Sequence, residues 1–129
     1  MSTISQRVVA AVVRRSDRLL VCQRPAHKRH GGLWEFPGGK CERGESDHQA
    51  ITRELAEELD VQVTAVGDAL FSASDPDSPF VIVFLPVEIL GEPVCIEHAA
   101  IAWVSPQDLA TYALAPSDAR FVKSFGHVE

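Results

Sequence analysis

The segment from Gly38 to Val61 constrains this chain more than any other, because it joins a glycine pair to a helical pattern rich in glutamate. Ser46 and Gln49 have the spacing of a capping box, in which two side chains satisfy free backbone N–H groups at a helix start. No Gly or Pro follows before Leu59, and apolar residues recur at helical spacing. The segment predicts a helix that begins after Ser46 and packs one face against the protein.

Three glutamates of this helix, Glu54, Glu57 and Glu58, fall on one side, because residues three and four apart are neighbours on a helix. That side borders the apolar stripe near Ile51, so we expect the carboxylates at the boundary between helix and body. Like charges there repel one another and lose solvation, and a divalent cation such as Mg²⁺ or Mn²⁺ relieves both costs. The alternative is a solvated acidic face on which Arg53 pairs with Glu57.

The whole chain, residues 1–129, is expected to form one α/β domain, since it is long enough to bury a core. The β-branched run Val8–Val13 is typical of a strand buried on both faces, and Leu19–Gln23 predicts an antiparallel partner. Ser105 has the features of an N-cap, and a last helix is expected from Ala115 to about Phe125. With further strands expected over 33–37, 61–71, 80–90 and 100–104, this order suits a mixed sheet between helices.

Two residues in the second half predict irregular pairing. Gly67 lies within the expected strand 61–71 and indicates a bulge. Pro86 cannot donate to a ladder, so it is expected at an edge or a bulge. Asp75 to Pro79 is predicted to be a turn.

The net charge of −6 and the lack of a Lys/Arg block argue against a nucleic-acid polymer or an anionic membrane as a partner. A small polyphosphate remains compatible, since a metal can supply the positive charge. The three cysteines show neither zinc nor redox spacing, and their odd number suits a reducing compartment. With no signal-peptide pattern and only short apolar runs, we expect a cytoplasmic protein without a membrane span.

Basic residues flank the glycine pair. Arg24 ends the second expected strand, where a guanidinium can hold a phosphate as a planar fork or can simply face solvent. Lys40 follows Gly38 and Gly39, whose backbone freedom can turn a carbonyl toward a metal and leave room for a phosphate. The alternative is a structural turn with a solvated lysine.

The spacing of these residues resembles the Nudix box of the Nudix hydrolases. From Gly39 to Val61 the defined positions match in order, with one departure at Asp60. The box has Gly there, which supplies a left-handed residue after the helix. Asp adopts this conformation at modest cost, so we expect lower stability rather than lost chemistry.

The resemblance extends over nearly the whole chain and is strongest to the MutT-type branch, including the bacterial CTP pyrophosphohydrolases. It is carried by Gln23–Pro25, Gly32–Lys40, the spacing from Glu97 to Trp103, and Leu114–Asp118. It implies a Nudix-type α/β/α sandwich around a mixed β-sheet. It also implies Mg²⁺-dependent hydrolysis of a nucleoside triphosphate to a monophosphate and pyrophosphate, with Mn²⁺ as an alternative metal.

The family's metal and catalytic roles transfer to matching positions only. The implied metal ligands, direct or through water, are the Gly38 carbonyl, Glu54, Glu57, Glu58 and Glu97. Arg53 would orient Glu45 through an ion pair. Either Glu54 or Glu97 would accept the proton of the attacking water.

The resemblance also implies the substrate contacts Arg24, Lys40, Phe36 and Asp118. Asp118 would face the base, whereas as a helix cap it would only accept backbone N–H bonds. An ionised carboxylate only accepts hydrogen bonds, which favours an amino group such as N4 of cytosine. A protonated one could also donate and would suit an oxidised guanine.

Two functions of different class follow. The first is an enzyme acting on a cytidine, 5-methylcytidine or oxidised purine triphosphate. The second is a non-catalytic Nudix-like module that binds a nucleotide or a partner. Such modules usually lack glutamates of the box, whereas all are present here, so the enzyme is the favoured hypothesis. The sequence leaves a monomer and a homodimer open.

Overall fold

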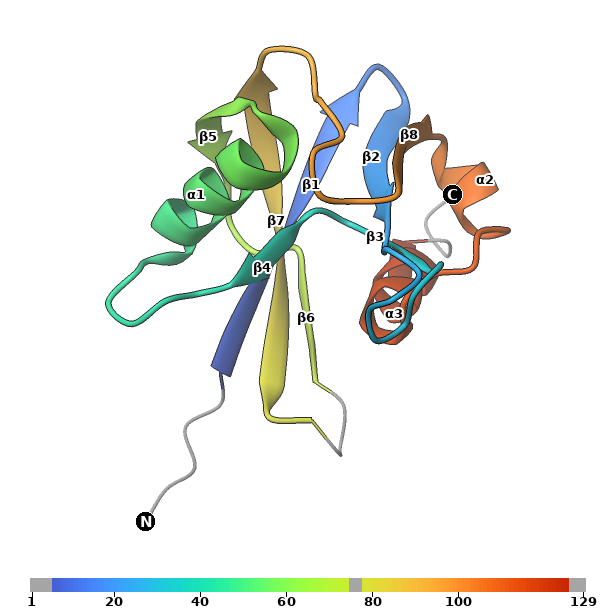
Figure 1. Ribbon diagram of the computed structural model, residues 1–129, viewed down its shortest axis with the longest axis horizontal. Coiled ribbons are helices and arrows are strands. Elements are labelled where there is room, and N and C mark those ends of the chain that lie inside the picture. Colours follow the sequence, from blue (N-terminus) through green and yellow to red (C-terminus); the bar gives the residue numbers. More distant parts are fainter. Residues whose placement is uncertain (1–5, 75–77, 126–129) are drawn as a thin grey trace.

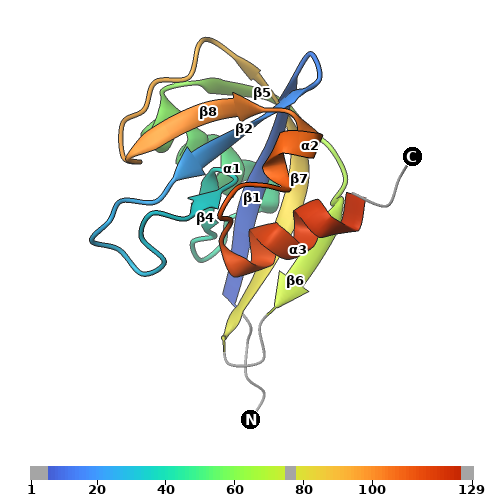
Figure 2. The same cartoon turned by 90° about the vertical axis from the view of Figure 1, so that its right-hand side faces the viewer.

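The computed structural model describes residues 6–74 and 78–125. A mixed sheet forms the middle of the molecule, with α1 on one side and α2 and α3 on the other (Figures 1 and 2). The predicted α/β sandwich is therefore confirmed. The elements in chain order are β1 (Gln6–Arg15), β2 (Arg18–Gln23), β3 (Trp34–Glu35), β4 (Gly38–Lys40), α1 (Asp47–Leu59), β5 (Gln62–Val66), β6 (Phe71–Ser74), β7 (Phe80–Leu90), β8 (Ala100–Val104), α2 (Pro106–Leu109) and α3 (Pro116–Phe125).

β1 lies at the centre of the sheet. It runs parallel to β7 and antiparallel to β2 and β4. Alternate residues of β1 enter two different cores, with Val9 in the cluster that contains Leu55 of α1 and Ala10 in the cluster of Phe84 and Phe121. This is the strand buried on both faces that the sequence predicts.

Helix α1 begins and ends as its sequence predicts. Ser46 and Gln49 form a complete capping box, with Ser46 Oγ accepting from the Gln49 N–H over 3.1 Å and Gln49 Oε1 accepting from the Ser46 N–H over 2.9 Å. Asp60 follows the helix in the left-handed conformation, at φ 56° and ψ 42°. Its N–H donates to the Ala56 carbonyl, which closes the last turn.

The predicted single strand from Val61 to Phe71 is wrong. The structure divides it into β5 and β6, which both pair with β7, and the register shift falls between Val63 and Ala65. The break faces Pro86, whose carbonyl accepts the Gly67 N–H over 2.9 Å. A strand residue directs its N–H and C=O to the same neighbouring strand. The nitrogen of Pro86, which has no hydrogen to donate, therefore also faces the break between β5 and β6. Pro86 is thus tolerated inside the sheet, beside an interrupted partner, rather than at an edge.

The glycine pair forms part of a strand, and not the structural turn that was the alternative interpretation of the sequence. Gly38 and Gly39 belong to β4 and pair with Ala10 and Val9 of β1. Gly38 has a φ of +154°, and a Cβ there would lie 1.9 Å from the Val9 carbonyl oxygen. The close approach of the two backbones therefore requires glycine.

The predicted α2 and α3 are confirmed, with Ser105 Oγ accepting the Asp108 N–H over 3.2 Å as the cap of α2. The turn predicted over 75–79 lies partly outside the described residues. No helix in the described part of the chain is long and apolar enough to cross a membrane.

Candidate active site

Two adjoining cavities open beside α1, β4 and α3. The smaller, of about 230 Å³, is bordered by the acidic side chains Glu54, Glu58 and Glu97 and by the backbone of Gly38. The larger, of about 320 Å³, is bordered by Lys40, Phe80, Asp118 and others. Arg24 and Glu35 border both cavities and so mark the boundary between them. The structure thus brings most of the sequence-predicted residues to one place.

The glutamates of α1 differ strongly in environment. Glu58 is only 6% exposed, and its carboxylate accepts the Gly38 N–H over 3.3 Å. Burial, and then a hydrogen bond with Glu54, raises the pKa of Glu58 to about 9. Glu57 instead faces solvent, with 53% of its side chain exposed. The expected boundary position is therefore right for Glu54 and Glu58 and wrong for Glu57.

A glycine makes room for the Glu54 carboxylate. A Cβ on Gly39 would lie 2.4 Å from the Glu54 carboxyl carbon. Two consecutive glycines therefore have separate roles. Gly38 lets β4 approach β1, and Gly39 leaves space for a carboxylate of the site.

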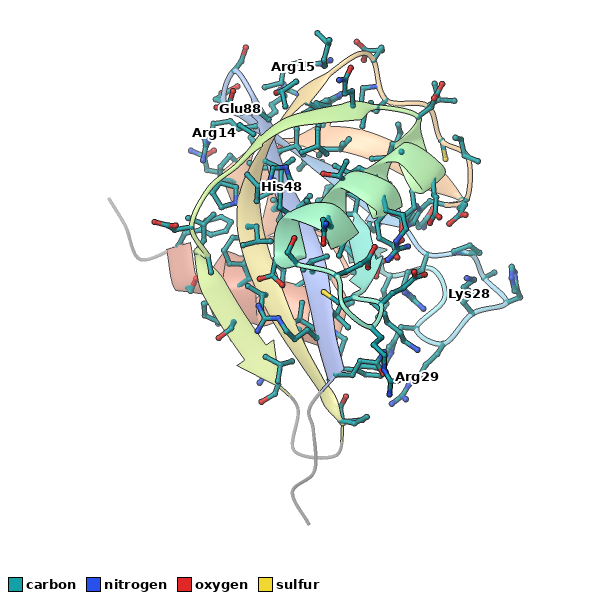
Figure 3. All side chains as sticks on the ribbon, turned by 90° about the vertical axis from the view of Figure 1, so that its left-hand side faces the viewer. Arg14, Arg15, Lys28, Arg29, His48 and Glu88 are labelled. Atoms are coloured by element: carbon teal, nitrogen blue, oxygen red, sulfur yellow. The ribbon has the colours of Figure 1, made fainter. Side chains whose placement is uncertain are left out.

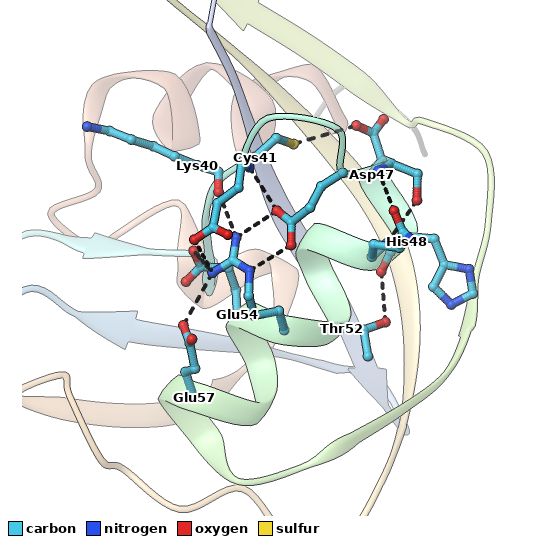
Figure 4. A network of polar contacts seen from close by, with 12 residues as sticks. Lys40, Cys41, Asp47, His48, Thr52, Glu54 and Glu57 are labelled. Atoms are coloured by element: carbon cyan, nitrogen blue, oxygen red, sulfur yellow. Dashed lines mark hydrogen bonds and ion pairs between the residues drawn. The ribbon is translucent and has the colours of Figure 1, made fainter.

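Arg53 organises the acidic face of α1. Figure 4 shows the polar network in which Glu54, Glu57 and Lys40 take part. It makes a two-pronged contact with Glu45, from Nε over 2.7 Å and from Nη2 over 2.8 Å. Its Nη1 donates to Glu54 over 3.1 Å, and its Nη2 also reaches the Lys40 carbonyl over 3.0 Å. The bound guanidinium lowers the pKa of Glu45 to about 2. The contact with Glu57 is the longest of these, at 3.4 Å.

The loop between β7 and β8 brings Glu97 to the smaller cavity. Backbone hydrogen bonds anchor it at both ends, from Ile96 N–H to the Glu58 carbonyl over 3.2 Å and from Ala99 N–H to the Gln23 carbonyl over 2.9 Å. Glu97 itself is exposed. A residue far from α1 in sequence is therefore held next to the buried glutamates by main-chain contacts.

Arg24 is held in place by its own loop and by β3. Its Nε donates to the Arg29 carbonyl over 2.7 Å, and its Nη1 donates to Glu35 over 3.0 Å. Lys28 and Arg29 extend from the same loop (Figure 3), and each borders one of the two cavities. Basic side chains therefore border the smaller cavity together with the glutamates, and such groups can bind a phosphate chain through charge-assisted hydrogen bonds.

Sequence reasoning missed Glu35 and His98. Glu35 accepts from Arg24 and also lies 3.1 Å from Nε2 of His98, whose side chain is 8% exposed. Both residues fall inside segments that carry the family resemblance. Nothing in their spacing indicates that they meet, because β3 and the loop before β8 are far apart along the chain.

Asp118 borders the larger cavity and is 6% exposed. Its Oδ2 accepts the Phe36 N–H over 2.9 Å. Burial raises the pKa of Asp118 to about 7, partly offset by the Phe36 N–H, which favours the ionised form. The carboxylate thus joins α3 to the segment between β3 and β4.

The Phe36 side chain does not border either cavity. Its ring is 3% exposed and packs at 6.0 Å from Phe84 and 5.4 Å from Phe121, measured between ring centroids. Only its backbone reaches the site, through Asp118. The aromatic ring beside the larger cavity is Phe80, and Lys40 Nζ lies 4.9 Å from its centroid.

The donors around the smaller cavity fit a hard divalent cation. They are carboxylate and carbonyl oxygens, and two of the carboxylates share a hydrogen bond at a buried position. Within 6–74 and 78–125, no three His, Cys, Asp or Glu side chains already converge on one point. Binding a cation there would therefore require rotation of exposed side chains such as Glu57 and Glu97.

Comparison with known proteins decides the family. The family model for the NUDIX domain matches residues 4–125. The chain belongs to the Nudix hydrolase family. The CTP pyrophosphohydrolase of Escherichia coli is 40% identical over 121 residues, covering 92% of this chain and 89% of the relative. An 8-oxo-dGTP diphosphatase of Haemophilus influenzae is 29% identical, covering 90% and 88%.

Solved structures agree with this Nudix assignment. A MutT structure from work on Aliivibrio salmonicida and Vibrio cholerae superimposes with a TM-score of 0.81 at 35% identity, covering 92% of this chain and 94% of that one. The MutT-type branch suggested by the sequence is confirmed. Nudix hydrolases use a divalent metal, which matches the oxygen donors around the smaller cavity.

Proposed function

We propose that this Nudix hydrolase converts a nucleoside triphosphate to a monophosphate and pyrophosphate, with Mg²⁺ as its metal. The observation that carries the proposal is the adjacency of the two cavities. Arg24, paired with Glu35, lies between a carboxylate-lined cavity and one large enough for part of a nucleotide. A phosphate chain would lie across this boundary with the base in the larger cavity.

The proposed roles agree with the positions of the residues, except that Glu57 borders neither cavity and would have to rotate toward the metal. Glu54, Glu57, Glu58, Glu97 and the Gly38 carbonyl would hold the metal, which when bound neutralises phosphate charge and lowers the pKa of water. Arg24 and Lys40 would bind the phosphates. Arg53 keeps Glu45 ionised and holds Glu54 in the cavity. Either Glu54 or Glu97 would take the proton of the attacking water.

Asp118 is the proposed selector of the base. Its buried carboxylate borders the larger cavity, and its raised pKa of about 7 makes both protonation states accessible near neutrality. The ionised state accepts a hydrogen bond from an amino group such as N4 of cytosine. The protonated state can also donate to an oxidised guanine. CTP and 8-oxo-dGTP, named for the relatives above, are therefore the first substrates to compare.

The experiment compares kcat/KM for CTP, 5-methyl-dCTP, dGTP and 8-oxo-dGTP in the wild type, Asp118→Asn and Asp118→Ala. Base selection by Asp118 predicts that ratios between nucleotides change by about tenfold, the effect of one good hydrogen bond to a charged group. If all four values fall together, Asp118 has only a structural role.

A non-catalytic module remains the second candidate. The complete set of box glutamates and the space that Gly39 leaves for Glu54 favour the enzyme.

Cys22, Cys41 and Cys95 are free thiols, which supports the proposed reducing, cytoplasmic location. Light scattering of the purified protein would decide between monomer and homodimer.

A further inference from the structure

Glu35 contacts two groups from distant parts of the chain. One carboxylate oxygen accepts from Arg24 Nη1 over 3.0 Å, and the other lies 3.1 Å from His98 Nε2. Arg24 follows β2, whereas His98 comes directly after Glu97 in the loop before β8. One side chain thus connects the proposed phosphate ligand to the loop that carries Glu97.

The His98 ring is buried in a way that packing alone does not explain. Only 8% of the side chain is exposed, and among the described residues its Nδ1 is a buried polar atom with no hydrogen-bond partner. An unpaired buried nitrogen loses its solvation without gaining a hydrogen bond, a cost that an apolar ring of similar size would avoid. The feature that a histidine adds at this place is the contact of Nε2 with Glu35.

The rest of the loop is anchored through its backbone. Besides the Ile96 and Ala99 contacts, the Val94 N–H donates to the Leu59 carbonyl over 2.8 Å. These bonds fix the path of the main chain along α1 and β2. Glu97 is exposed, so its place over the smaller cavity depends on the residues on either side of it.

We propose that Glu35 and His98 are positioning residues that hold Glu97 and Arg24 in the arrangement needed for turnover. The proposal rests on the proposed function, because it assigns a role in the same site. Glu35 orients the Arg24 guanidinium toward the shared boundary of the cavities, and His98 fixes the adjacent Glu97 relative to it. A small displacement of a catalytic group is enough to reduce turnover about tenfold or more.

Three variants test this role. His98→Phe keeps a ring but removes the Nε2–H donor, and His98→Gln restores an amide N–H that can reach Glu35. Val94→Ala is the matched control, since this side chain lies in the same loop and is 50% exposed. We expect His98→Phe to lower kcat for CTP at least about tenfold with a smaller change in KM, and His98→Gln to recover most of the loss.

Backbone hydrogen exchange provides a readout that does not depend on activity. The Ile96 and Ala99 amides should exchange about tenfold faster in His98→Phe than in the wild type, because the loop opens locally. Amides between β1 and β7 and the melting temperature should stay unchanged. Val94→Ala should resemble the wild type in kcat, exchange and melting temperature.

Two results would overturn the proposal. The first is a His98→Phe protein with wild-type kcat and wild-type exchange at both loop amides. The second is a parallel fall of kcat and melting temperature that His98→Gln does not recover, which would mean a purely structural role. If the wild type hydrolyses no nucleotide, the proposed function fails, and the exchange data alone then support or overturn the Glu35–His98 contact.

Discussion

The carboxylate of Asp118, in the first turn of α3, accepts the backbone N–H of Phe36 over 2.9 Å. Through this contact the last helix is attached to the segment that leads into the Gly38–Gly39 pair. The side chain therefore has a structural partner and borders the larger cavity at the same time. Its protonation should influence folding as well as base selection.

Asp118→Asn should change how stability depends on pH. The pKa of Asp118 is raised from 3.8 to about 7 by burial, so the folded protein keeps a proton that the unfolded chain has lost. The contribution of Asp118 to wild-type stability therefore falls as pH rises from about 4 to about 7. Asn carries no such proton, so the free energy of unfolding of the variant relative to wild type should rise across this window by at most about 4 kcal/mol.

Urea unfolding at several pH values between 4 and 7 measures this difference. The neighbouring Glu35 and Arg24 are present in both proteins, so their own effects largely cancel in the comparison. A difference in stability that does not vary with pH would show that Asp118 titrates at its ordinary value.

Glu58→Gln and Glu57→Gln should separate metal binding from folding. Glu58 is buried with a pKa raised to about 9, so an uncharged Gln should leave stability unchanged or higher without metal. Glu57 is half exposed, so Gln there should change stability little. Saturating Mg²⁺ should raise the wild-type melting temperature, because a bound ligand stabilises the folded state, and should raise it less in both variants.

Both variants should lose most of their turnover while remaining folded by circular dichroism. Near-normal Mg²⁺-dependent activity in both proteins, with wild-type stabilisation by Mg²⁺, would refute the assignment of these glutamates as metal ligands.

Asp60→Gly should stabilise the protein slightly. Asp60 has the left-handed conformation, at φ 56°, that Gly adopts more easily. The gain should stay below about 1 kcal/mol, because Gly also raises the entropy of the unfolded chain. Asp60→Ala is the matched control and should be less stable than either. A clear fall in melting temperature for Asp60→Gly would mean that the Asp60 side chain makes a needed contact.

Gly38→Ala should lose stable folding, whereas Gly39→Ala should lose activity. A Cβ on Gly38 would meet the Val9 backbone at 1.9 Å, which nothing can relieve without moving β1, so this variant should not fold stably. A Cβ on Gly39 meets only the movable end of Glu54, at 2.4 Å from its carboxyl carbon. Gly39→Ala should therefore fold but lose activity and Mg²⁺ affinity. Thermal melts and isothermal titration with Mg²⁺ distinguish the two, and equal stability of both variants would contradict the account.

Local patterns predicted much of this fold. The capping box of α1, the left-handed Asp60 and the N-cap of α2 depend on residues close in sequence, and all three are confirmed. The division of 61–71 into two strands was not predictable in the same way. It depends on Pro86, which lies opposite Gly67 only after β7 has paired with its neighbours.

The site shows the same limit. The Nudix box predicted that α1 carries site residues, and the family resemblance predicted Glu97 and Asp118 as further site residues. The contacts of Glu35 with Arg24 and His98 join three segments, so no sequence spacing could indicate them. Likewise, helical periodicity placed Glu57 on the same side of α1 as Glu54 and Glu58. It could not show that the rest of the protein covers Glu54 and Glu58 and leaves Glu57 exposed.

Mg²⁺-dependent product formation from CTP and 8-oxo-dGTP tests the central claim most directly. Chromatography of the products should show one monophosphate and one pyrophosphate for each triphosphate consumed. Formation of these products should be nearly absent in Glu58→Gln under the same conditions. A nucleotide that binds without being cleaved, or cleavage to a diphosphate and inorganic phosphate, would contradict the proposed pyrophosphohydrolase.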